Sequence, residues 1–258
     1  MFGLRELDRV LRGEWASPGQ SIGPLVRASL LLAMSYGICM GVFGLMGRGD
    51  DWEYRQVIAC MVKVPALFLL SILVTFPSLY VFNTLIGSKS SWSELAGMLS
   101  GAMGIIAAVL AGLGPIVAFF SLTTISYPFA ILMNVAAFGC ASVIGIVQLY
   151  RMINRFLQAT SAKAEAASGA AAASDAAAPA DVNFNTNAPP NPFLRRDPRE
   201  SKQVFYVWTV LFAVVGMQMS WILRPFIGSP QLPFTWFRPR SGNFFEAVLH
   251  SIRAMSGG

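Results

Sequence analysis

The chain has 258 residues, of which 55% are hydrophobic and 12% are charged, with a net charge of +6. Its mean hydropathy is +0.56. This composition excludes an ordinary soluble domain, in which about a quarter of the residues are charged. No stripe of basic and aromatic residues indicates a nucleic-acid surface, so we expect the positive charge to reflect membrane orientation and contact with anionic lipid.

Long stretches of the chain contain no Asp, Glu, Lys or Arg. A hydrocarbon layer about 30 Å thick requires roughly 20 apolar residues per helix. Each charge-free block is long enough to cross it, and the third can cross it twice. The sequence therefore predicts an all-α, multi-pass transmembrane helical bundle of about five spans. The blocks are Ala28–Gly47, Val64–Ser88, Leu95–Tyr150 and Gln203–Leu223.

The first part of the chain, residues 1–22, is expected to be a cytoplasmic amphipathic segment without a cleaved signal peptide, because charges alternate with Leu4, Leu7 and Leu11. The first span then follows, at about residues 23–46. Its glycines Gly37, Gly41 and Gly44 lie on or near one face and would allow another helix to approach closely.

Residues 23–157 are predicted to form a four-span membrane bundle. The second helix runs over about 57–86, and Lys63 lies near its start, where its stem is expected to snorkel to the headgroups. Pro65 and Pro77 should bend this helix. The third and fourth spans, about 95–122 and 129–150, form a helical hairpin.

Residues 158–202 change character abruptly to Ala, Pro and Asn. We expect most of this stretch to be a disordered linker, because it offers little apolar surface to offset the entropy of ordering it. Its first few residues can extend the fourth helix, since Ala favours helix. The fifth span is expected at residues 203–223.

Residues 224–258 are predicted to be an aromatic Arg-Pro segment followed by an amphipathic helix, with Asn243 and Glu246 as its capping box. Two interpretations stay open. The aromatics and arginines can anchor the chain at the membrane interface, or they can form a docking surface for a partner or a specific lipid. The candidate contact residues are Arg224, Phe226, Phe234, Trp236, Phe237, Arg238 and Arg240.

No catalytic or metal-binding constellation is visible, so neither enzymatic activity nor a cofactor is predicted. The single histidine, His250, follows Glu246 by four residues, but a third ligand is missing nearby. No ionisable residue is expected at membrane depth. The polar residues expected there are Asn134 and Gln218, for which hydrogen bonding between helices or a place near a helix end is the simplest interpretation.

The basic residues favour one orientation. With five spans and a cytoplasmic N-terminus, twelve Lys and Arg lie on the cytoplasmic side and seven lie on the other. We therefore expect an integral protein of the bacterial inner membrane, with its N-terminus and the linker in the cytoplasm.

Ser21-Ile22-Gly23-Pro24-Leu25, at the mouth of the first span, resembles the Asp-Leu-x-Gly-Pro motif of the Yip-domain family of five-span membrane proteins, although the acidic position is absent. Tyr127-Pro128 before the fourth span is a second similarity. The resemblance implies five spans over residues 23–223. In eukaryotes the family is linked to vesicle traffic and small GTPases, a role not carried over here because the acidic residue is part of the motif. The bacterial members that this chain resembles have no assigned role.

Two functions are consistent with these features. The first is a non-enzymatic scaffold that organises a protein partner, lipids or a second copy of the chain. The alternative is a subunit of a membrane transporter. A deep, water-filled cavity lined by Asn134 and Gln218 would favour transport, whereas a closed bundle with a projecting aromatic C-terminus would favour the scaffold.

Overall fold

A computed structural model describes residues 4–12, 22–46, 53–85, 92–124, 126–175, 198–227, 234–237 and 242–256. All regular elements in these ranges are helical, which confirms the predicted all-α class. The helices are α1 (Leu4–Leu11), α2 (Ile22–Gly41), the 3-10 helix η1 (Val42–Met46), α3 (Glu53–Leu85), α4 (Trp92–Thr123), α5 (Tyr127–Asp175), α6 (Pro198–Ile222) and α7 (Phe244–Ser256).

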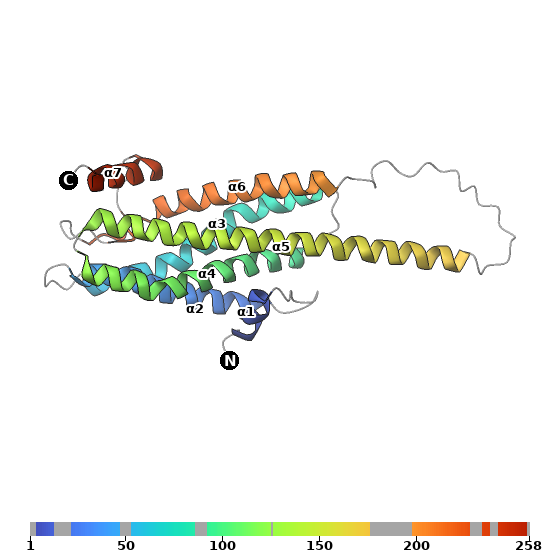
Figure 1. The fold of residues 1–258 in the computed structure, drawn as a ribbon, viewed down its shortest axis with the longest axis horizontal. Helices are drawn as coiled ribbons and strands as arrows, with labels where there is room; N and C mark the ends of the chain where they lie inside the picture. The colour runs from blue at the N-terminus through green and yellow to red at the C-terminus, as the bar shows by residue number, and fades with distance from the viewer. Residues whose placement is uncertain are drawn as a thin grey trace.

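Within the described ranges, four helices are long and apolar enough to cross a membrane, over Ile22–Leu45, Tyr54–Val81, Leu95–Thr123 and Tyr127–Arg151. Helix α6 has a shorter apolar stretch, Tyr206–Ile222. The direction of the chain alternates through α2, α3, α4, α5 and α6, so that the bundle runs up and down (Figure 1). This is the architecture of a multi-pass helical bundle.

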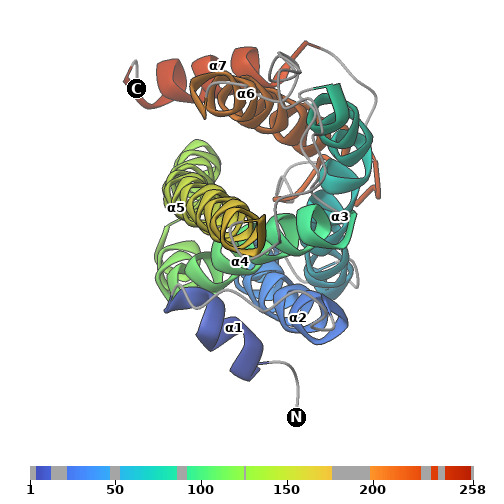
Figure 2. The same ribbon diagram turned by 90° about the vertical axis from the view of Figure 1, so that its right-hand side faces the viewer.

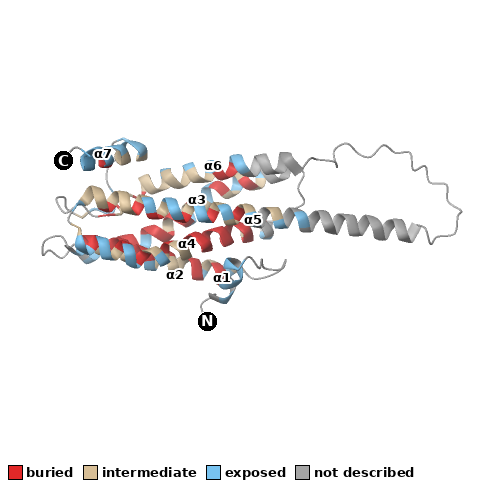
Figure 3. Cartoon of the chain, viewed as in Figure 1, coloured by how far each residue is buried: buried red, intermediate tan, exposed pale blue. Residues whose placement is uncertain are grey.

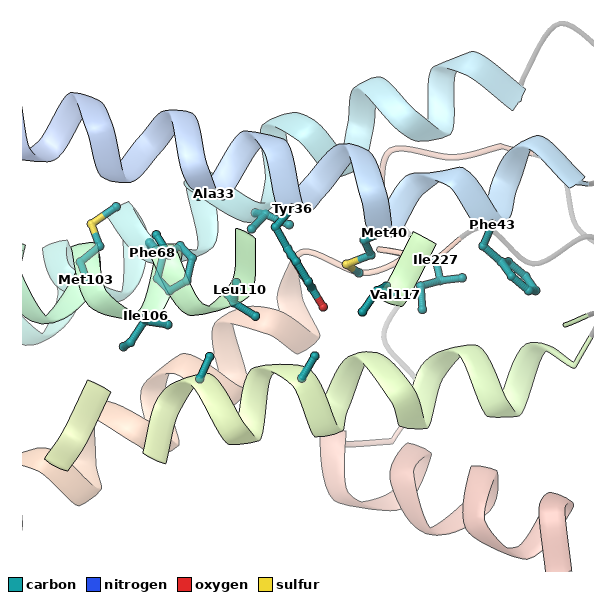
Figure 4. Close-up of a cluster of buried hydrophobic side chains, with 14 of the residues drawn as sticks. Ala33, Tyr36, Met40, Phe43, Phe68, Met103, Ile106, Leu110, Val117 and Ile227 are labelled. Carbon is teal, nitrogen blue, oxygen red and sulfur yellow. The ribbon is translucent and has the colours of Figure 1, made fainter. Parts of the chain in front are cut away.

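The bundle is assembled from neighbouring helices around an apolar core. Helix α2 packs on α3 and α4, α4 packs on α5, and α6 packs mainly on α3. Viewed along the bundle, these helices form an open arc with α6 at one end (Figure 2). The main buried cluster joins Tyr36 of α2, Phe68 of α3 and Leu110 of α4 (Figure 4). It also includes Ala137 of α5. Exposed residues alternate with buried ones along the helices (Figure 3). Many of the exposed residues are large and apolar, as expected of surfaces that meet lipid.

Two glycines explain the close contact between α2 and α3. A Cβ added at Gly37 would lie 2.6 Å from the carbonyl oxygen of Cys60, and one added at Gly41 would lie 2.8 Å from the Cα of Val57. The two helices can approach this closely only because neither position carries a side chain. The predicted close approach at Gly37 and Gly41 is thereby confirmed.

Helix α1 is short and amphipathic, as predicted. Its Leu7 is buried against Leu25 of α2 and Ile105 of α4. A Cβ added at Gly104 would lie 2.9 Å from Leu7, so this glycine also makes room for α1. Asp8, on the exposed side of α1, forms an ion pair with Arg12, the residue that follows the helix.

The boundaries predicted for the linker require correction. Helix α5 does not end near Tyr150 but continues to Asp175, and α6 begins at Pro198. Both ends of the stretch expected to be disordered, residues 158–202, are therefore helical. Alanine is the best helix former, and a helix already nucleated in the membrane extends through it at little cost. Residues 176–197 of this predicted linker lie outside the described residues.

Candidate functional site

The most distinctive local structure lies where α3 meets the segment that joins α6 to α7. We name residues 223–243 the α6–α7 segment; residues 223–227, 234–237 and 242–243 of it are described. On α3, Gln56, Cys60 and Lys63 are all buried. Their spacing of four and then three residues places them on one face of the helix, and this face is turned towards the α6–α7 segment.

These three side chains donate hydrogen bonds to the backbone of the α6–α7 segment. Lys63 Nζ lies 2.8 Å from the carbonyl oxygen of Pro225 and 2.6 Å from that of Trp236. The amide of Gln56 and the thiol of Cys60 both donate to the carbonyl oxygen of Phe226. Four donor contacts from one helix face thus hold carbonyl groups from two parts of the segment.

The segment needs such donors because it leaves the helical path. Helix α6 ends at Ile222, and Pro225, which follows a cis peptide bond, cannot donate a backbone hydrogen bond. Carbonyl groups of irregular backbone at membrane depth are tolerated only where protein satisfies them. Leu223, Pro225 and Ile227 are nevertheless buried. Ile227 reaches the main core beside Val117 and Met40 (Figure 4), so the segment is part of the bundle.

Lys63 contradicts two predictions. Its side chain is 3% exposed and does not snorkel to the headgroups. It lies nine residues after Tyr54, where the apolar window of α3 begins, which is about 14 Å along the helix. An ionisable residue is therefore present inside a predicted span. Its ammonium group also lies 5.3 Å from the ring centroid of Phe237, a favourable cation–π distance.

The two ends of the segment are fixed by further contacts. The guanidinium of Arg224 stacks on the ring of Trp221 at 3.7 Å. The indole N–H of Trp221 donates to the carbonyl oxygen of Gly242, 3.1 Å away. Gly242 has a φ of 75°, a conformation that strongly favours glycine. The end of α6 is thus tied directly to Gly242, two residues before the start of α7.

Helix α7 begins as the sequence predicted. The side chain of Asn243 accepts a hydrogen bond from the backbone N–H of Glu246 at 2.9 Å, which is an N-cap contact. The large apolar residues of this amphipathic helix after its first residue are Phe245, Val248, Leu249, Ile252 and Met255. All of these except Val248 are exposed.

The predicted contact residues differ in exposure. Phe226 and Phe234 are partly buried, whereas Trp236 and Phe237 are 46% and 60% exposed. Arg224 is partly buried in the stack on Trp221. Arg238 and Arg240 lie outside the described residues. Among the described contact residues, those with exposed side chains are therefore Trp236 and Phe237, which lie next to the buried Lys63.

The two polar residues predicted within the spans occupy different environments. Asn134 of α5 is buried; its side-chain oxygen accepts a 2.9 Å hydrogen bond from Tyr36 of α2, and its amide donates to the carbonyl oxygen of Ala130. The bond with Tyr36 joins α5 to α2, which is the hydrogen bonding between helices that we expected for Asn134. Gln218 of α6 is exposed.

The chemistry available at the site is binding and positioning. In the part of the chain that the structure describes, no group of three or more His, Cys, Asp and Glu side chains could hold a metal ion. Glu246 and His250 are both exposed on α7. The α3 donors are directed at backbone carbonyl groups, so the geometry they create is that of an anchor.

The spacing of polar residues along α3 indicates the anchor, although the overall composition of the chain does not. Gln56, Cys60 and Lys63 recur with helical spacing within an otherwise apolar helix. Three polar groups on one face of such a helix indicate a polar partner on that side. Their acceptors are backbone carbonyls more than 160 positions away, which leave no mark on the sequence.

Comparisons with known proteins identify no relative: no family model, no curated protein and no solved structure matches the chain.

Proposed function

We propose that the chain is a non-enzymatic integral membrane scaffold, a subunit that organises a membrane complex through its α6–α7 segment. The observation that supports this most strongly is the anchoring of irregular backbone by Lys63, Gln56 and Cys60. The anchor fixes Trp236 and Phe237 in place with their rings exposed. Rigid, exposed aromatic side chains are the residues that most often dominate protein interfaces, because little conformational entropy is lost when they are buried.

The proposal places the scaffold in the bacterial inner membrane, with the N-terminus in the cytoplasm. The support is the distribution of basic residues between the two ends of the bundle. Helix α1 and the extension of α5 lie at one end, and the α6–α7 segment with α7 lies towards the other (Figure 1). Relationship to the Yip-domain family is part of the proposal, and the up-and-down order of the helices supports it.

Isolation of partners from the native membrane tests the scaffold function. Tagged full-length chain is extracted in mild detergent, and the proteins and lipids that remain bound are identified by mass spectrometry. We expect one protein partner to be retained by the wild type and lost with Trp236→Ala/Phe237→Ala. Phe119→Ala is the matched control, because Phe119 on α4 is 61% exposed and Phe237 is 60% exposed. Retention by the double variant, or equal loss with Phe119→Ala, would contradict the proposal.

One observation favours a transporter subunit as the second candidate. Transporters place binding sites where a helix is interrupted inside the membrane, often next to a buried charge. Here α6 ends near the buried Lys63, whose ammonium group is held by two carbonyl oxygens. Proteoliposomes containing the full chain test this candidate through proton flux under an applied gradient. Flux that is abolished by Lys63→Met would support transport, and flux equal to that of empty vesicles would count against it.

A further inference from the structure

We propose that α7 is an interfacial helix that inserts an apolar face into the outer part of the lipid bilayer. The surface in question is separate from Trp236 and Phe237, so the inference does not depend on the proposed partner. It is supported by how the exposed and buried residues of α7 are distributed around the helix.

The first face of α7 packs on the protein. Helix α7 contacts both α5 and α6. The less exposed residues Phe244, Ala247, Val248 and Ser251 follow a spacing of three and four, which defines one face. Ser251 is buried and its hydroxyl donates to the carbonyl oxygen of Ala247. This face is directed towards the bundle.

The second face is apolar and has no cover. Phe245, Leu249 and Ile252 also recur with helical spacing, roughly a quarter to a third of a turn from the bundle-facing side. Their side chains are 47–53% exposed, as is that of Met255. Four large apolar side chains exposed on a 13-residue helix would be unfavourable in water.

The third face of α7 is polar, and it distinguishes lipid from protein as the partner of the apolar face. Glu246, His250 and Arg253 follow the same three-to-four spacing on the far side of the helix, and all are exposed. A helix with one side on protein, one apolar side and one charged side fits the boundary between hydrocarbon and water. It does not fit burial inside a larger protein assembly, where the charged side would lose its hydration.

The position of α7 also favours lipid. Helix α7 packs on α5 and α6, whose own outward surfaces expose apolar residues, among them Val143, Val147, Val210 and Val214. In Figure 1, α7 lies beside the bundle near one of its ends. The exposed apolar face of α7 therefore belongs to a helix that packs on two others with exposed apolar surface of their own.

Environment-sensitive labels on the full-length protein test this assignment. Single cysteines replace Leu249, Ile252, His250 or Arg253 after Cys39→Ala and Cys140→Ala, and Cys60 is retained because it is fully buried. Each variant carries an NBD fluorophore and is reconstituted into vesicles of phosphatidylcholine and phosphatidylglycerol. Some vesicles contain phospholipid with a nitroxide on the acyl chain, which quenches fluorophores in the hydrocarbon region. A melting temperature equal to that of the wild type verifies that each labelled variant is folded.

We expect nitroxide quenching at positions 249 and 252 to exceed that at 250 and 253 by at least about twofold, because an interfacial helix inserts its apolar face by roughly 5–10 Å. The pattern should not change when the protein-to-lipid ratio is varied tenfold. Equal quenching on both faces would overturn the inference. So would NBD fluorescence typical of water at all four positions. Quenching at 249 and 252 that disappears at high protein density would also overturn it, by showing that a second copy covers the stripe.

Discussion

At the scale of single residues, the structure separates two kinds of glycine. Gly37 meets the backbone of α3, where a Cβ would lie 2.6 Å from Cys60, whereas Gly112 has no atom within 4 Å of such a Cβ. We expect Gly37→Ala to destabilise the protein by about 1–3 kcal/mol, because backbone cannot move aside as a side chain can. Thermal unfolding in detergent measures the difference.

Gly112→Ala is the matched control for this substitution. It makes the same chemical change in a membrane helix where there is open space. Its melting temperature should equal that of the wild type or exceed it slightly, since alanine favours helix. Equal losses in both variants would mean that α2 and α3 are not in close contact.

The two outcomes at Gly37 and Lys63 show what the sequence can indicate about a residue. The Gly37–Gly41 pair was predictable because small residues four positions apart have one common use, close helix packing. Lys63 was interpreted wrongly because a lysine near the start of a span usually snorkels. Its acceptors, the carbonyl groups of Pro225 and Trp236, belong to backbone and carry no side-chain signature.

At the scale of elements, Trp208 is the α6 side chain most deeply buried between α6 and α3. Trp208 is 1% exposed, and its indole N–H donates to the carbonyl oxygen of Thr75 at 3.3 Å. Trp208→Ala should destabilise the protein by about 3–5 kcal/mol, the usual cost of truncating a large buried aromatic residue. Denaturant titration of the purified chain measures this free energy.

Tyr206 lies on the same helix and is 61% exposed. Tyr206→Ala therefore removes an aromatic ring without opening a cavity, and its free energy of unfolding should remain within about 0.5 kcal/mol of the wild type. If both variants lose similar stability, α6 is attached to the bundle by general apolar contact and not by Trp208.

The elements differ in how well the sequence specified them. Charge-free blocks located α2 to α5 because most of the length of a span must be apolar. The continuation of α5 to Asp175 was missed because the alanine-rich stretch offers no apolar surface for packing. Local helix propensity alone, which is strong for alanine, determines its structure.

At the scale of the whole molecule, five spans would place the two ends of the chain on opposite sides of the membrane. We expect cysteine at Gln158, exposed on the extension of α5, to face the cytoplasm, and cysteine at His250 to face outward. A membrane-impermeant maleimide applied to intact cells should modify only His250→Cys. Labelling of Gln158→Cys alone would reverse the orientation, and labelling of both would contradict the five-span arrangement.

The overall architecture was more predictable than the site within it. Hydrophobicity along the chain was sufficient for a multi-pass bundle, since each span satisfies its own backbone hydrogen bonds. The return of the α6–α7 segment to α3 depends on contacts between residues far apart in the chain, such as Lys63 with Trp236. These contacts join an apolar helix to a proline-rich stretch, and neither segment alone indicates the other.

The central claim is that Lys63 holds the α6–α7 segment on the bundle. Hydrogen exchange measured by mass spectrometry on full-length protein in lipid nanodiscs tests it most directly, with Lys63→Met compared with Arg55→Gln. Arg55 is an exposed cation two turns earlier on α3. A buried carbonyl group that loses its hydrogen-bond donor costs about 1–3 kcal/mol. A difference of about 1.4 kcal/mol changes an equilibrium constant about tenfold. We therefore predict roughly tenfold or faster exchange in residues 223–227 and 234–237 of Lys63→Met alone. Unchanged exchange in that variant, or equal acceleration in Arg55→Gln, would contradict the account.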